Sequence, residues 1–94
     1  MFIKTVVIEG IDQEVRISRT QRGAEATIQQ RTRHAGVQDI CIAHIARDDD
    51  DARRFAQAVE VAKVVCGTDK RGNANATNSM IHDVLREMER VAGC

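Results

Sequence analysis

The sequence predicts an α+β fold, in which a four-stranded antiparallel β-meander is followed by two C-terminal α-helices (ββββαα). In the N-terminal half, apolar residues alternate with polar ones, as on strands that bury one face. In the C-terminal half, apolar residues recur every three or four positions, as on a helix. The turns between the alternating segments are short, and short turns join antiparallel neighbours.

The sheet is expected to span about residues 1–46, with strands at 2–9, 14–20, 24–33 and 39–46. The second and third strands should each bury one face, which carries Val15, Ile17, Ala24, Ala26 and Ile28. The fourth strand shows little alternation, which predicts a central strand or one covered on both faces.

The two helices are expected at about residues 49–66 and 77–92. An aspartate from the run before the first helix should cap it, and Gly67 should end it in a left-handed conformation. We expect the first helix to lie on one face of the sheet. The second helix should pack on the first or reach a second copy of the chain, giving a homodimer through Met80, Leu85 and Met88.

Composition limits the class of protein. The 94 residues predict a single domain, and 14 basic residues balance 14 acidic ones. This balance excludes a strongly basic nucleic-acid-binding chain or an acidic tail. The three cysteines are an odd number without close pairing, and the longest apolar run is far too short for a bilayer. We therefore expect a cytoplasmic protein with reduced thiols and no membrane contact.

No residue pattern predicts an enzyme, so we assign no catalytic residue, cofactor or metal. Cys41 and His44 have half of a zinc-site spacing, but residues three apart on a regular strand face opposite sides. The segment from Gly67 to Gly72 follows a helix, not a strand, and lacks the Lys-Ser/Thr pair of a phosphate loop. We therefore expect this segment to be a flexible polar connector between the helices.

Charged residues gather in two places along the chain. Five arginines on the second and third strands and their turn predict a basic patch on the polar face of the sheet. Four consecutive aspartates predict an acidic patch that docks a basic protein surface or mimics phosphates against a nucleic-acid-binding protein. The expected partner-binding residues are Arg16, Arg19, Arg31, Arg33, Asp48, Asp49, Asp50 and Asp51. The sequence thus favours a non-enzymatic protein that binds a protein partner, in the manner of phage and mobile-element regulators or inhibitors.

The alternative is binding of single-stranded nucleic acid across the arginine-bearing face. The order of four strands and a helix, over about residues 1–66, is similar to that of the Whirly and PUR-repeat families, and this resemblance implies such binding. It is a resemblance of topology only, and no motif residue is carried over. Sequence-tolerant binders stack bases on aromatic rings, whereas the only aromatic residues here are Phe2 and Phe55.

Overall fold

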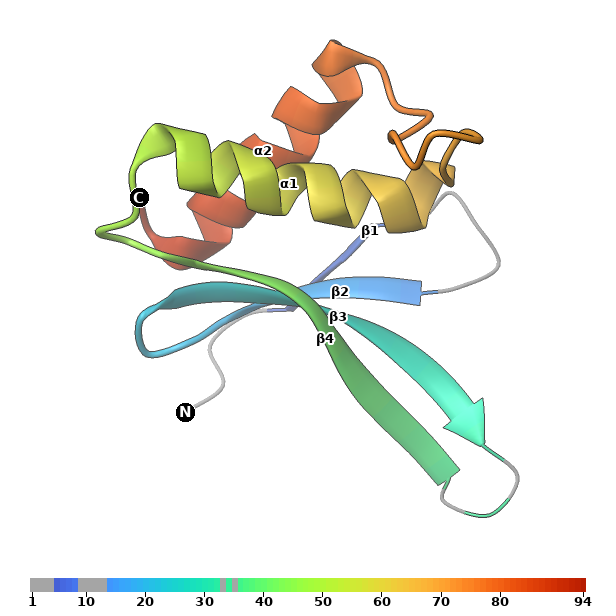
Figure 1. Cartoon of the computed structure of the whole chain (residues 1–94). Helices are drawn as coiled ribbons and strands as arrows, with labels where there is room; N and C mark the ends of the chain where they lie inside the picture. The colour runs from blue at the N-terminus through green and yellow to red at the C-terminus, as the bar shows by residue number, and fades with distance from the viewer. Residues whose placement is uncertain (1–4, 9–13, 33, 35) are drawn as a thin grey trace.

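The computed structural model describes residues 5–8, 14–32, 34 and 36–94 (Figure 1). It confirms the α+β class, with an antiparallel sheet followed by two C-terminal helices. The elements are β1 (Thr5–Ile8), β2 (Glu14–Arg19), β3 (Gly23–Thr32), β4 (Gly36–Ala46), α1 (Asp51–Cys66) and α2 (Asn78–Ala92). The strands neighbour one another in chain order, and every pair is antiparallel.

The molecule has two layers, with both helices on the same face of the sheet (Figure 1). Helix α2 packs directly on β2 and β3, while α1 packs on β4 and on α2. The prediction that α2 packs on α1 is confirmed, and α2 also packs directly on the sheet. Its apolar face completes the core of the chain, because Met88 is fully buried between the layers. Met88 is thus inaccessible to a second copy, whereas Met80 is exposed.

The alternation of β2 and β3 predicted their buried face correctly. Val15 and Ile17 of β2 are buried, and Ala24, Ala26 and Ile28 of β3 lie beside them. Gly23 begins β3 where the backbone of β4 passes very close: a Cβ placed there would lie 2.1 Å from the carbonyl oxygen of Ile45. Only glycine therefore fits this end of the hairpin without a shift of the backbone.

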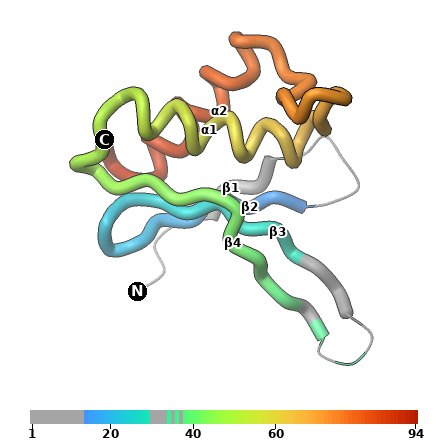
Figure 2. Tube along the Cα trace, in the orientation of Figure 1, coloured from blue at the N-terminus to red at the C-terminus, as the bar shows by residue number. Residues whose placement is uncertain are grey.

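Strand β4 is the last strand of the sheet, neither central nor covered on both faces as predicted. Its inner half, Ala43–Ala46, lies under α1, and Ala43 and Ile45 are buried there. Its outer half, Gln38–Cys41, is exposed and leads away from the helices (Figure 2). The apolar composition of this strand therefore reflects two different environments and not one fully buried strand.

The helix ends follow the predicted chemistry with one correction. The Asp50 side chain accepts the backbone N–H of Arg53 and caps α1, as expected for one residue of the aspartate run. Thr77 caps α2 in the same way, and Gly93 ends α2 in a left-handed conformation. Gly67 ends α1 with a positive φ of 78°, which favours glycine, but its ψ of 179° lies outside the left-handed helical region that the sequence predicted.

The connector between the helices is held by internal hydrogen bonds. Asp69 Oδ1 accepts the backbone N–H groups of Arg71 at 2.8 Å and of Asn73 at 2.9 Å. Thr68 and Ala74 form a β-bridge across the turn. The N–H of Asn73, and after it that of Arg71, lowers the pKa of the Asp69 carboxyl. The connector is therefore a turn with internal hydrogen bonds, and its flexibility stays a prediction.

Within the described part of the chain, neither helix combines the length and the hydropathy that crossing a bilayer requires.

Candidate charged interface

Of the arginines that the sequence places on the polar face of the sheet, the structure describes one side chain there, that of Arg16. Arg16 lies on this face, and its Nε is 3.0 Å from Glu14 Oε1 on the same strand. The strand register places Glu25 of β3 and Asp39 of β4 on the same face. Among the side chains that the structure describes on β2, β3 and β4, acidic groups therefore outnumber arginine on this face.

Arg19, another predicted arginine of the patch, lies on the opposite face of β2 from Arg16. Arg19 has the same orientation along β2 as Val15 and Ile17, toward the helices. Its Nη2 would lie 3.3 Å from a Cβ placed on Gly93, at the C-terminal end of α2. A cation there is favourable because carbonyl groups point outward from that helix end. Arg33 and the side chain of Arg31 lie outside the described residues.

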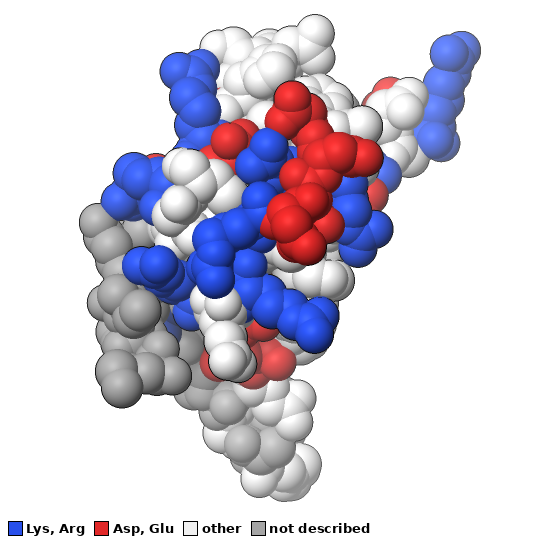
Figure 3. Space-filling model, turned by 90° about the vertical axis from the view of Figure 1, so that its left-hand side faces the viewer, with Lys and Arg blue, Asp and Glu red and all other residues white. Residues whose placement is uncertain are grey.

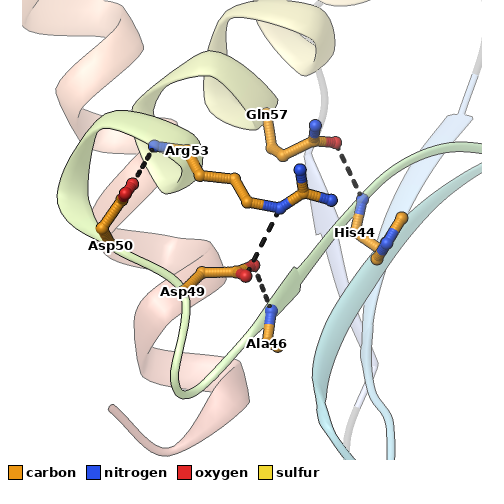
Figure 4. Close-up of polar contacts among 6 residues, drawn as sticks. All are labelled: His44, Ala46, Asp49, Asp50, Arg53 and Gln57. Carbon is orange, nitrogen blue, oxygen red and sulfur yellow. Dashed lines mark hydrogen bonds and ion pairs between the residues drawn. The ribbon is translucent and has the colours of Figure 1, made fainter.

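The aspartate run mainly builds the junction between β4 and α1. Asp49 Oδ2 accepts the backbone N–H of Ala46 at 2.8 Å, and Asp49 Oδ1 lies 3.3 Å from Arg53 Nε (Figure 4). The Asp49 side chain is only 17% exposed. Asp50 is occupied by capping α1. These two carboxylates therefore each make a contact within their own chain, and their part in docking a partner stays a prediction.

The two outer aspartates of the run are exposed. Asp51 pairs with Arg54, whose Nη2 lies 2.6 Å from Asp51 Oδ1. This hydrogen bond, more than any other contact, raises the pKa of the Arg54 guanidinium. Asp48 lies in the turn before the helix and is exposed. Of the four predicted acidic contact residues, Asp48 and Asp50 are exposed and form no ion pair with the described residues, and Asp50 also caps α1.

A β-bulge changes the relation between Cys41 and His44. Ala26 of β3 is opposite Ala43, but the next residue, Thr27, is opposite Cys41, so Ile42 is the extra residue. Cys41 and His44 therefore share the polar face, and the prediction that they face opposite sides was wrong. Both are exposed. No group of three or more His, Cys, Asp or Glu side chains among the described residues could hold a metal ion.

Charged side chains do converge at one end of the molecule, where the β2–β3 turn meets the β4–α1 junction (Figure 3). An open pocket of ≈ 1000 Å³ lies there, which we call the arginine pocket. Its charged lining residues are Arg22, Arg47, Arg53, Glu25, Asp48 and Asp49, and His44 also lines it. The pocket therefore presents three basic and three acidic groups on one concave surface.

The three arginines are held in different ways. Arg47 donates from Nη1 to the carbonyl oxygen of Ala92 at 3.3 Å and from Nη2 to that of Gln21 at 2.6 Å. These bonds tie the β4–α1 junction to the end of α2 and to the β2–β3 turn. No carboxylate of the described residues forms an ion pair with Arg47. Arg53 is fixed by Asp49. Arg22 is exposed, and no ion pair of the described residues includes it.

Sequence reasoning missed Arg47 and Arg53 as members of a site. The spacing of Asp49 and Arg53, four residues apart at a helix start, does signal an ion pair. The pocket itself depends on how the β2–β3 turn approaches the β4–α1 junction, which is a tertiary contact without a local pattern.

No family model, curated protein or solved structure matches this chain.

Proposed function

We propose that this chain is a small non-enzymatic binding protein that engages a protein partner through the arginine pocket. The observation that carries this proposal is the convergence of Arg22, Arg47 and Arg53 on one open concave surface. Arginine is enriched at protein interfaces, because its planar guanidinium makes several directed hydrogen bonds while its stem packs against apolar surface.

The charge arrangement favours a protein partner over a nucleic acid. Glu25, Asp48 and Asp49 lie among the three arginines, so a chain of phosphates in the pocket would meet carboxylates as well as guanidinium groups. A protein surface can present both signs of charge in a complementary pattern, which gives specificity against wrong partners. A regulatory or inhibitory role, as in small phage and mobile-element proteins, fits such a module.

The side chains of Arg47 and Arg53 are already held in place in the unbound chain. Arg47 is anchored by two carbonyl groups and Arg53 by Asp49, so their side chains lose little further freedom on binding. Arg22 lies on the β2–β3 turn and is exposed, so it is available for a new ion pair. We therefore expect Arg22 to contribute most to recognition and the other two to shape the pocket.

The test compares three baits in affinity capture from a lysate of the source organism, followed by mass spectrometry. The baits are the unaltered chain, Arg22→Glu and the control Lys70→Glu, which reverses an exposed charge in the connector. We expect a protein that the unaltered chain and Lys70→Glu retain and that Arg22→Glu loses. Its retention should weaken as salt is added, because exposed charges are screened.

Two results would contradict the proposal. In the first, no captured protein distinguishes Arg22→Glu from Lys70→Glu, so the pocket has no part in recognition. In the second, a labelled single-stranded oligonucleotide binds at low salt and Arg22→Glu abolishes that binding, which would assign the pocket to nucleic acid. Circular dichroism of each bait before the capture establishes that it is folded.

A further inference from the structure

We propose that a second copy of this chain pairs with the outer half of β4, so that two sheets join edge to edge about a twofold axis at Ile40. This surface is separate from the arginine pocket, and the inference goes beyond the proposed function. The inference follows from a difference between the two halves of the edge of β4 that faces away from β3.

The inner half of that edge is covered by side chains of the β4–α1 region (Figure 4). The backbone N–H of His44 donates to Gln57 Oε1 at 3.2 Å, and that of Ala46 donates to Asp49 Oδ2 at 2.8 Å. These N–H groups point away from β3, and the two side chains occupy the places where another strand would bind. No further strand can pair with this half without displacing them.

The outer half lacks such cover. Because the bulge at Ile42 resets the alternation, Asp39 and Cys41 are the positions whose backbone groups turn outward, as those of His44 do. Gln38, Asp39, Ile40 and Cys41 are all exposed. In the described part of the chain, no side chain accepts the backbone N–H of Asp39 or Cys41. The edge also has no proline or lysine, which commonly block such pairing.

Charge selects the register of a pairing between two copies. Asp39 is the one charged residue between Gly36 and Ala43. A twofold axis at Asp39 would place two carboxylates opposite each other, which is unfavourable. An axis at Ile40 instead places Asp39 opposite Cys41 of the second copy. The outward N–H and C=O groups of each Asp39 then meet those of the other chain's Cys41.

The apolar face supports the same register. Val15, Ile28 and Ile40 are opposite one another across β2, β3 and β4, and their exposed fractions are 0%, 9% and 42%. The Ile40 of a second copy extends this row of apolar side chains across the axis, and it covers the exposed Ile40 of the first copy. Because the paired strands run in opposite directions, the helix layers of the two copies lie at opposite ends of the joined edges.

A strand pair of this length buries less surface than a standard protein interface, so the dimer should be weak and concentration-dependent. The test is sedimentation velocity of the purified chain over a series of concentrations up to the order of 100 µM, where micromolar dimers form. The variant is Ile40→Lys. The control is Met80→Lys, because Met80 on α2 is a large apolar residue exposed to a similar extent, 43% against 42%.

We expect the unaltered chain and Met80→Lys to dimerise alike, and Ile40→Lys to dimerise at least about tenfold more weakly because two lysines face each other at the axis. Circular dichroism establishes that each variant is folded. A monomer at every concentration would overturn the inference. So would a dimer that Met80→Lys disrupts and Ile40→Lys does not, since this would place the contact on α2.

A second measurement fixes the register. In a chain whose exposed Cys41 and Cys94 are both replaced by serine, Ile40→Cys should form an interchain disulfide on mild oxidation. Met80→Cys in the same background is the control and should not. Cross-linking through Met80→Cys, or none through Ile40→Cys, would contradict a twofold axis at Ile40.

Discussion

The two halves of β4 each place an isoleucine on the apolar face of the sheet, but the two isoleucines lie in different environments. Ile45 in the inner half is 1% exposed, whereas Ile40 in the outer half is 42% exposed. Helix α1 covers the inner half and supplies Gln57 to its edge, and Asp49 of the β4–α1 junction reaches the same edge (Figure 4). The outer half extends beyond the helix layer (Figure 1). The reach of the helices, more than the hydropathy of the strand, decides which isoleucine belongs to the core.

The largest expected difference between the halves concerns these two isoleucines. Ile45→Ala removes buried methyl groups and leaves a cavity, so it should lower the free energy of unfolding by about 2–5 kcal/mol. Ile40→Ala should lower it by less than about 1 kcal/mol in dilute protein, because much of that side chain already meets water. Urea denaturation measures both. Equal losses would show that the two halves are equally buried.

The next effect concerns the aspartate run. Asp49→Ala removes the acceptor of the Ala46 N–H and the ion pair of Arg53, and it should cost about 1–3 kcal/mol in the free energy of unfolding. Asp48→Ala, one residue earlier and exposed, should change it by less than about 0.5 kcal/mol. Thermal denaturation of the two variants side by side would reveal the difference. Comparable losses would argue against a structural role for Asp49.

A smaller effect is expected at the edge itself. Gln57→Ala removes the side-chain acceptor of the His44 N–H, which water can replace because the site is exposed. We expect a change of less than about 1 kcal/mol in stability, together with faster hydrogen exchange at the His44 amide. Unchanged exchange at His44 would mean that Gln57 does not protect the edge.

Acid should weaken the connector through Asp69. The folded pKa of Asp69 is lowered, so its contribution to stability is complete above the unfolded value of about 3.9 and is lost as pH falls through the lower folded value. The amide resonances of Arg71 and Asn73 should report this titration below the usual aspartate range. Asp69→Asn should remove it. A titration at the ordinary aspartate pH would contradict the folded turn.

The sequence predicted the parts of the fold that have a local pattern. Alternation identified Val15, Ile17 and Ile28 as buried, and the aspartate run correctly indicated a helix cap. These features depend on neighbours in the chain, so periodicity and capping chemistry suffice to recognise them.

The parts that the sequence could not predict depend on tertiary geometry. The bulge at Ile42 brings Cys41 and His44 to one face, and it has no distinctive residue. The position of β4 at the edge and the turning of Asp49 toward Ala46 follow from where α1 lies on the sheet. The arginine pocket likewise forms only where two distant connections meet.

Amide hydrogen exchange along β4, measured at a low and a high protein concentration, tests the contrast between its halves most directly. We expect slow exchange at His44 and Ala46 at both concentrations. At Asp39 and Cys41 we expect exchange that is fast in dilute protein and slower in concentrated protein. Uniform exchange along the strand, unchanged by concentration, would contradict it.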